Sequence, residues 1–152
     1  MTQKEEKLLE IAKNVIAMNT GINAALTGSL LLVHSDYRTR REASDIDIIC
    51  DTLCAKEEGS PNVPAGFTIV EMDGGGSEVD SIVYQNEEGV KIDFMWSDES
   101  KKTINGILCG SPEYLVRAKL SFARNDKTEE SRQKHLDDVL YLINENDILL
   151  SF

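Results

Sequence analysis

The chain is organised around the segment Gly28 to Ile48, which reads GSLLLVHSDYRTRREASDIDI. Near its end, Asp45 and Asp47 alternate with isoleucines. Side chains of a strand point to alternate faces, so the two carboxylates lie on one side and the isoleucines on the other. Carboxylates about 7 Å apart along a strand can converge on ions between them. The pattern therefore favours a divalent-cation site, although an Asp-x-Asp pair taken singly is more often a surface feature.

The start of the segment, Gly28-Ser29, has the composition of a phosphate-binding turn. A glycine at a strand end followed by serine lets backbone amides and a hydroxyl face a phosphate, and a following helix adds its partial positive charge. Arg38, Arg40 and Arg41 lie between the turn and the aspartates. Thr-Gly-Ser is also a common turn, and an arginine cluster is usually a solvated loop. Beside a phosphate site, these arginines would instead hold a triphosphate.

A third acid occurs in the later segment 90–96. Apolar residues alternate along this segment, which places Asp93 on the face opposite to them. If the segment pairs with the strand expected at 45–50, Asp45, Asp47 and Asp93 meet on one open face of a sheet. Like charges about 4 Å apart cost on the order of 4 kcal/mol per pair at an effective dielectric near 20, so such a cluster raises its pKa values or binds a cation. Oxygen-only ligands favour Mg²⁺ or Mn²⁺, with water and substrate phosphate completing the shell.

Hydrophobic periodicity predicts an α/β (α+β) fold, a mixed sheet of about five strands flanked by helices. We expect helices at about 3–19, 30–33, 112–124 and 128–144, and strands at 23–27, 45–50, 67–72, 80–85 and 90–96. A loop is expected at 57–66, and a glycine link at 74–76 and a turn at 86–89 indicate an antiparallel meander. We expect one domain over residues 1–152, with the core sheet and N-terminal helix in 1–110 and a helical pair in 111–152.

The composition and net charge argue against some classes of function. The 152 residues carry a net charge of −11, with 41% hydrophobic and 28% charged residues, as is usual in a globular protein. This charge argues against an extensive nucleic-acid surface, which needs Lys and Arg to neutralise phosphates. Apolar runs are short and the N-terminus is charged, so we expect neither a membrane partner nor a signal peptide. Cys50, Cys54 and Cys109 are odd in number and lack zinc-type spacing, which predicts free thiols in a cytoplasmic protein.

Taken in order, Gly28-Ser29, Asp45-x-Asp47 and Asp93 resemble the nucleotidyltransferase superfamily that includes DNA polymerase beta. The resemblance covers residues 23–96. It implies a mixed sheet flanked by helices, with two metal ions held by the three aspartates. It also implies that Asp93 assists the catalytic ion and activates the attacking hydroxyl, while Gly28 and Ser29 hold phosphates of the nucleotide.

The region 115–143 resembles a narrower branch, the abortive-infection type nucleotidyltransferases, some of which are toxins of toxin–antitoxin pairs. In that branch a helix with a lysine precedes a helix with a Lys-Asp-x-x-Asp motif. Lys119 matches the lysine that meets the nucleotide's phosphates. Lys134 and Asp138 match the second motif, in which His135 here replaces the first aspartate. The alternatives are a solvated helix face for Lys119 and a surface ion pair between Lys134 and Asp138.

The residues and the resemblance together predict a metal-dependent nucleotidyltransferase. It would move a nucleoside monophosphate from a nucleoside triphosphate to a hydroxyl of an RNA end, a protein or a small molecule, and release pyrophosphate. The expected requirements are Mg²⁺ or Mn²⁺ and the triphosphate. The expected partner is a second subunit that completes the cleft, or an antitoxin-like protein. Two alternatives stay open: a catalytically silent nucleotide- or partner-binding module of the same fold, and a structural domain in which Asp45 and Asp47 cap loops.

Overall fold

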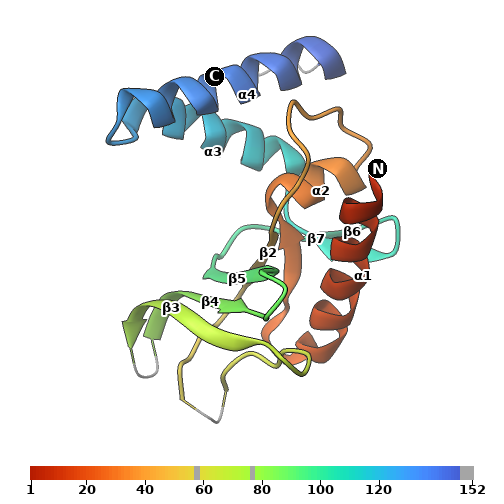
Figure 1. Ribbon diagram of the computed structural model, residues 1–152, viewed down its shortest axis with the longest axis vertical. Helices are drawn as coiled ribbons and strands as arrows, with labels where there is room; N and C mark the ends of the chain where they lie inside the picture. The colour runs from red at the N-terminus through yellow and green to blue at the C-terminus, as the bar shows by residue number, and fades with distance from the viewer. Residues whose placement is uncertain (57–58, 76–77, 148–152) are drawn as a thin grey trace.

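The computed structural model describes residues 1–56, 59–75 and 78–147, and Figure 1 shows their course. The helices are α1 (Gln3–Met18), a 3₁₀ helix (Thr20–Ile22), α2 (Gly28–His34), α3 (Pro112–Asn125) and α4 (Glu129–Asn146). The strands are β1 (Ala25–Thr27), β2 (Ile46–Cys50), β3 (Thr68–Gly75), β4 (Glu78–Gln85), β5 (Lys91–Trp96), β6 (Lys102–Ile104) and β7 (Ile107–Cys109). Gly76 of the expected glycine link, and Glu57 and Glu58 of the expected loop, lie outside the described residues.

Within the described residues, seven strands form one mixed sheet in the order β3-β4-β5-β2-β1-β7-β6. β2 pairs in parallel with β5, and β1 pairs in parallel with β7, while the other neighbours are antiparallel. The mixed sheet flanked by helices that the sequence predicts is therefore confirmed. The expected count of about five strands is wrong, because β6 and β7 were not expected.

The unpredicted strands β6 and β7 form a hairpin around Asn105 and Gly106. Both turn residues have positive φ, +46° and +81°, as a type I′ turn requires. Asn-Gly between apolar residues is a strong hairpin signal, so the sequence does contain the information. Each strand is three residues long, too short to show the alternation by which the other strands are recognised.

The N-terminal helix α1 also holds the segment that precedes β2. Thr2 and Glu5 form a capping box at the start of the helix. Glu5 is 4% exposed, and its second carboxylate oxygen accepts a hydrogen bond from the amide of Ala43 at 3.0 Å. Burial raises the pKa of Glu5, but the amides of Thr2 and Ala43 outweigh burial and hold that pKa below its ordinary value. One buried carboxylate thus fixes both the helix start and the approach of the chain to Asp45.

The hydrophobic core lies between the sheet and the helices α1 and α2. Figure 1 shows α3 and α4 together at one end of the molecule and the β3–β4 hairpin at the other. The largest fully buried side chains of the sheet and of α2 include Ile46, Ile48, Ile92, Phe94, Leu30 and Leu31. A smaller cluster joins α2 to the C-terminal helices through Leu32, Val116 and Leu142. The face of β2 and β5 that points away from the core is left for polar side chains.

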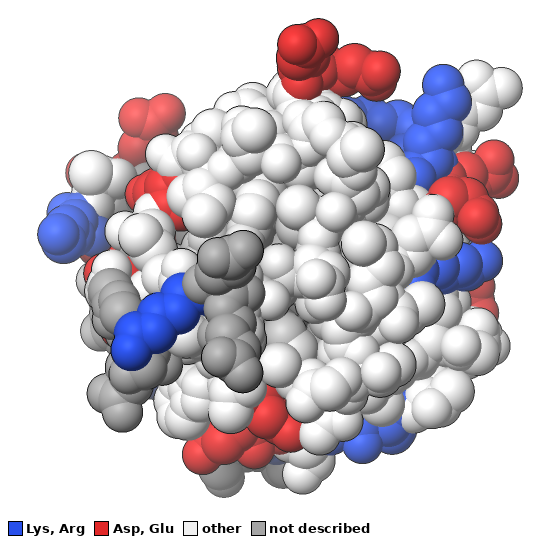
Figure 2. Space-filling model, turned by 90° about the horizontal axis from the view of Figure 1, so that it is seen from below, with Lys and Arg blue, Asp and Glu red and all other residues white. Residues whose placement is uncertain are grey.

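The outer surface carries charges of both signs. Figure 2 views the molecule from below, toward the end with the β3–β4 hairpin, and on this face the charged side chains stand around the margin of a largely uncharged middle. In the described part of the chain, no helix has both the length and the apolar character needed to cross a membrane.

Candidate active site

Two of the predicted acids, Asp47 and Asp93, stand side by side on neighbouring parallel strands. The register pairs Asp47 of β2 directly with Asp93 of β5. The residues on either side of each aspartate are buried in the core, so both carboxylates project from the opposite face. Asp45 is exposed and lies just before β2, which begins at Ile46 and not at Asp45 as expected. The pairing that the sequence argument requires is present, and Asp45 stands at the entrance to the strand.

A fourth acid, Glu71 of β3, lies in the same row across the sheet. The register pairs Glu71 with Val83 of β4, and Val83 with Asp93 of β5. Side chains in one row share a face of the sheet, so Glu71 lies on the same face as Asp93 and Asp47. These three residues, Asp47, Asp93 and Glu71, form an acidic row that runs to the sheet edge. Sequence reasoning missed this residue. Its neighbours Val70 and Met72 are exposed as well, so no alternation of polar and apolar residues distinguishes Glu71.

Two acids of this row, Asp47 and Asp93, have raised pKa values. Burial raises the pKa of Asp47 to about 7, with the negative charges of Asp93 and Asp45 adding to the rise and Lys119 opposing it. Burial likewise raises the pKa of Asp93 to about 6, helped by Glu71 and Asp45. Oδ1 of Asp93 is buried and has no hydrogen-bond partner among the described residues. A buried carboxylate oxygen without a donor favours protonation or a cation.

Gly28 lies directly beneath the carboxylate of Asp47. It has a φ of +72°, and a Cβ at this position would overlap Oδ2 of Asp47. The predicted phosphate turn therefore needs glycine for two reasons: the backbone conformation, and the close approach of an acid from the neighbouring strand.

We expect Gly28→Ala to destabilise the protein more than a glycine replacement that adds strain alone. Gly106 is a matched control, because its φ is +81° and a methyl group at this position would have no described atom within 4 Å. Gly106→Ala should cost about 1 kcal/mol of unfolding free energy, and Gly28→Ala about 2 kcal/mol more through overlap with Asp47. Urea unfolding of the two variants measures the difference. Equal costs would contradict the close packing of Gly28 against Asp47.

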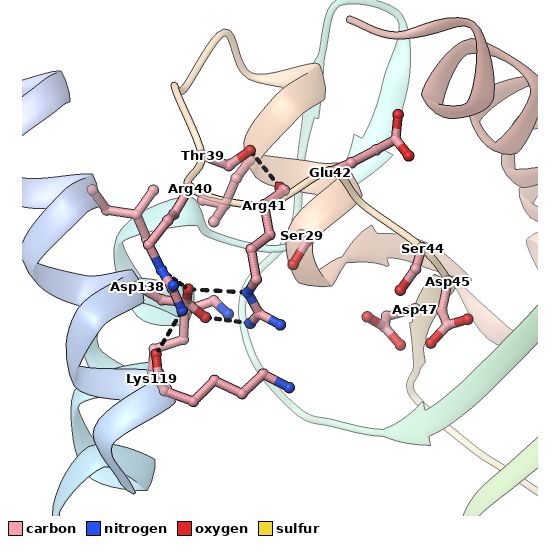
Figure 3. Close-up of a pocket in the computed structure, with 13 residues that line it drawn as sticks. Ser29, Thr39, Arg40, Arg41, Glu42, Ser44, Asp45, Asp47, Lys119 and Asp138 are labelled. Atoms are coloured by element: carbon pink, nitrogen blue, oxygen red, sulfur yellow. Dashed lines mark hydrogen bonds and ion pairs between the residues drawn. The ribbon is translucent and has the colours of Figure 1, made fainter. Parts of the chain in front are cut away.

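A polar cavity opens beside these acids. It has a volume of about 200 Å³, and its lining includes Ser29, Arg40, Arg41, Asp45, Asp47, Lys119, Lys134 and Asp138. Figure 3 shows the aspartates of β2 on one side of the cavity and the basic side chains on the other. The structure thus gathers three of the predicted nucleotide-binding residues, Ser29, Arg41 and Lys119, around one space. Gly28 is not part of this lining but lies next to it, below Asp47.

Asp138 of α4 binds the side chains of Arg40 and Arg41. Its side chain is 8% exposed, and its carboxylate oxygens accept hydrogen bonds from Nε of Arg40 at 2.9 Å and from Nη2 of Arg41 at 2.5 Å. Burial raises the pKa of Asp138, but the two guanidinium groups outweigh burial and hold it below its ordinary value. Figure 3 shows both arginines converging on this carboxylate from the loop before β2. These partners lie almost a hundred residues away in the chain, which is why the sequence offered Lys134 as the partner instead.

Lys119 of α3 extends into the space between Asp138 and the aspartates of β2 (Figure 3). Burial lowers the pKa of its ammonium group, a tendency that Asp138 and Asp47 oppose and Arg41 reinforces. A cation held between two acidic groups, in a cavity that also contains Arg41, is positioned to meet an anionic ligand.

A second cavity, of about 340 Å³, is also lined by Asp47. Three residues line both cavities: Ser29, Asp47 and Lys119. Its lining also includes His135, the residue that departs from the motif of the second C-terminal helix. Nε2 of His135 lies 3.1 Å from Oδ2 of Asp126, its ring packs against Phe122, and its Nδ1 is buried without a hydrogen-bond partner in the described residues. No sequence pattern indicates this pairing, which depends on the turn between α3 and α4.

The acidic row is compatible with a magnesium ion that shares its coordination with a substrate. Among the described residues, no three His, Cys, Asp or Glu side chains are gathered closely enough to hold a metal ion by themselves. Protein sites for Mg²⁺ commonly supply one or two carboxylates and leave the remaining positions to water and phosphate. The carboxylates of Asp47 and Asp93, at paired positions of β2 and β5, provide such a partial site. The residues present fit this ion as part of a ternary arrangement.

Comparison with known proteins shows which solved structures have a similar fold. No family model matches the chain, and no curated protein matches its sequence. Among solved structures, a candidate nucleotidyltransferase from H. pylori superposes with a TM-score of 0.56 at 15% identity, over 95% of this chain and 70% of that one. JHP933 from Helicobacter pylori gives 0.52 at 14% identity, over 95% of this chain and 68% of that one.

An antigenic nucleotidyltransferase-like protein from Paracoccidioides brasiliensis also superposes, with a TM-score of 0.52 at 14% identity, over 93% of this chain and 76% of that one. The chain has a nucleotidyltransferase-like fold. Identities this low establish the fold and leave the activity to be argued from the site.

Within the nucleotidyltransferase-like fold, the predicted acids occupy the start of β2 and the adjacent position of β5. The predicted cations approach from a loop and from α3 and α4. The site is therefore a cleft with an acidic wall built on the sheet and a basic wall built on the C-terminal helices and the loop that they hold.

Proposed function

We propose that this protein is a metal-dependent nucleotidyltransferase that moves a nucleoside monophosphate from a nucleoside triphosphate to a hydroxyl acceptor and releases pyrophosphate. The observation that carries the proposal is the pairing of Asp93 with Asp47, because Asp47 lines a cavity whose lining also includes the basic residues Arg41 and Lys119. Acids on one wall suit a cation, and bases on the other suit phosphates. A nucleoside triphosphate with Mg²⁺ brings both.

The donor would lie with its phosphates in the polar cavity. Arg41 and Lys119 would offset the negative charge of the β and γ phosphates, since guanidinium and ammonium groups form charge-assisted hydrogen bonds with phosphate oxygens. The hydroxyl of Ser29 would hydrogen-bond one of these oxygens. Lys134 lines the same cavity and would contribute at longer range. This arrangement leaves the α-phosphate beside Asp47, where the acidic and basic walls meet.

The transfer itself needs a proton acceptor beside the incoming hydroxyl. The acceptor oxygen forms a bond to the α-phosphorus, the bond from that phosphorus to the bridging oxygen breaks, and pyrophosphate leaves. We assign the hydroxyl proton to Oδ1 of Asp93, which has no hydrogen-bond partner among the described residues and belongs to a carboxylate with a pKa of about 6. Mg²⁺ would be held by Asp45, Asp47 and Asp93 only together with phosphate oxygens and water, and it would neutralise charge on the attacking and leaving oxygens.

The test combines binding with turnover. Thermal unfolding is measured with ATP, CTP, GTP and UTP, each with and without Mg²⁺, and release of pyrophosphate is measured in the same samples with mixed hydroxyl compounds. Ligand that binds the folded state raises the melting temperature by mass action, with about 2.7 kcal/mol of stabilisation at a hundred times its Kd. We expect a magnesium-dependent rise with at least one nucleotide. Its absence for all four at millimolar concentration would overturn the proposal.

A second candidate function is a silent nucleotide-binding module. It is favoured by the ion pairs with Asp138, which engage Arg40 and Arg41 within the protein itself. The same experiment separates the two candidates. A module of this kind binds the nucleotide and raises the melting temperature, but releases no pyrophosphate with any acceptor.

A further inference from the structure

The second cavity is mainly apolar, and neither arginine of the polar cavity, Arg40 or Arg41, is among the residues that line it. Its floor is formed by Ile49 of β2 and Met95 of β5, and its wall by the side chains of α3 around Ala118. At its margin stand three exposed aromatic residues, Trp96 at 52%, Tyr114 at 58% and Phe122 at 46% exposure. Aromatic surface left open to water around a concave site is typical of a binding pocket for an organic ligand.

The position of this cavity relative to the acids is fixed by the sheet. Ile49 pairs with Met95, two residues beyond the pair of Asp47 and Asp93 on the same two strands. Residues two apart on a strand share a face, and lie about 7 Å apart. The floor of the apolar cavity is therefore a direct continuation of the acidic row. A ring resting on Ile49 and Met95 can carry a hydroxyl that reaches the carboxylates.

The two cavities adjoin one another at Ser29, Asp47 and Lys119, which line both. In a phosphoryl displacement, the attacking and leaving oxygens are roughly in line on either side of the phosphorus. With pyrophosphate leaving into the polar cavity, the attacking hydroxyl arrives from the side of the apolar cavity. We propose, on the basis of the proposed nucleotidyl transfer, that the apolar cavity binds the acceptor, a positively charged ring compound with a hydroxyl group.

The polar groups of the cavity indicate the charge of this acceptor. Oε1 of Glu99 and Nδ1 of His135 are buried and have no hydrogen-bond partner among the described residues. A carboxylate oxygen accepts hydrogen bonds, so the Glu99 position suits an ammonium, amine or hydroxyl donor on the ligand. Asp47 lines the same cavity, with Asp93 and Glu71 in the row beyond it. Lys119 also lines the cavity, but two acids, Asp47 and Glu99, line it as well. An anionic acceptor, including a phosphate-bearing nucleic-acid end, would therefore meet net repulsion.

The chain contains one tryptophan, Trp96, and it stands at the cavity. Its fluorescence and its single indole NMR signal therefore report occupation directly. The probes are para-(aminomethyl)benzyl alcohol, which is a cation, para-(hydroxymethyl)benzoate, which is an anion of the same shape, and adenosine. We expect the cationic probe to shift the Trp96 signals and to bind about ten-fold tighter than the anionic one. An equal or reversed order, no shift at all, or tighter binding of adenosine would overturn the proposed acceptor class.

The location is tested by filling the cavity. Ala118→Phe places a ring in the cavity, and Ser121→Phe places the same ring on an exposed position of α3 outside it. We expect Ala118→Phe to abolish binding of the cationic probe and Ser121→Phe to leave it unchanged. Tyr114 is exposed, so Tyr114→Ala should not impair folding. We expect it to weaken binding of the cationic probe about three-fold or more. Retained binding in both Ala118→Phe and Tyr114→Ala would overturn the assignment.

The donor and acceptor roles are separated by titrating Mg²⁺-ATP and Mg²⁺-tripolyphosphate. If the acceptor occupies the apolar cavity, Ala118→Phe leaves both affinities unchanged. If Ala118→Phe weakens ATP and not tripolyphosphate, the cavity holds the donor's base and the inference fails while the proposed function stands. If wild-type protein binds the ring probe but neither ATP nor tripolyphosphate, the proposed function fails, and the acceptor assignment falls with it.

Discussion

Replacing Asp47 by asparagine is expected to raise the free energy of unfolding at about pH 8 by about 2 kcal/mol, although the same change should impair the proposed transfer. Burial and the neighbouring acids raise the pKa of Asp47 in the folded protein to about 7, from an ordinary value of 3.8. Stability from such a group is fully present below the unfolded pKa and is lost as the pH rises through the folded pKa. An asparagine carries no charge to bury and escapes this loss.

The gain should depend on pH and on magnesium. At about pH 4 the carboxyl group of Asp47 is protonated in the folded state, so Asp47→Asn and the wild type should differ little. At about pH 8, Mg²⁺ should stabilise the wild type and not the variant. Asp80→Asn, at an exposed position of β4, is the control and should behave as the wild type at both pH values. Urea unfolding provides the comparison. A variant that gains nothing at about pH 8 would contradict the buried, charge-coupled environment of Asp47.

In the same variant, transfer should fall by at least about a hundred-fold. Asp47 borders both cavities and stands where the α-phosphate would lie, so its charge is aimed at the reacting centre. Removing one such electrostatic contact from a preorganised site costs roughly 100-fold to 1,000-fold in rate. Release of pyrophosphate measures the loss. A more stable protein with less activity would mark Asp47 as a functional residue that the fold accommodates at a cost in stability.

Asp138→Asn is expected to lower the free energy of unfolding without ligand by about 2 kcal/mol. The carboxylate of Asp138 is nearly buried and neutralises Arg40 and Arg41, with Lys119 close by. Asparagine preserves the shape and removes the charge, which leaves these cations facing one another. The expected loss is smaller than for a fully buried pair, because both arginine side chains are partly exposed to water.

A polyanion should restore the stability that Asp138→Asn loses. Tripolyphosphate replaces the missing negative charge, so it should raise the melting temperature of Asp138→Asn more than that of the wild type. Asp137→Asn, one position earlier on α4 and paired with Gln133 at the surface, is the matched control and should change stability by less than about 0.5 kcal/mol. If tripolyphosphate stabilises both variants and the wild type equally, Asp138 does not hold the phosphate-facing cations.

Features that depend on local sequence patterns could be predicted, whereas features that depend on contacts between distant parts of the chain could not. The acids of β2 and β5 could be placed from the sequence because strand alternation is local, and the parallel pairing then brings Asp47 beside Asp93. The cavity walls could not be placed in this way. Asp138 pairs with arginines far away in the chain, and Glu71 reaches the acidic row only through two strand pairings. Such contacts depend on the assembled sheet and leave no periodic signal in the sequence.

The loop that carries Arg40 and Arg41 has no regular secondary structure, and its backbone is held from outside. The side chain of Asn146, near the end of α4, accepts a hydrogen bond from the amide of Arg38 at 2.7 Å and donates one to its carbonyl oxygen at 2.9 Å. Asp138 holds the same loop from a position about two turns nearer the start of that helix. The amides of this loop should therefore exchange their hydrogens with solvent in one opening event together with those of α4. Fraying of the last helix and loss of the basic wall are, for this protein, a single step.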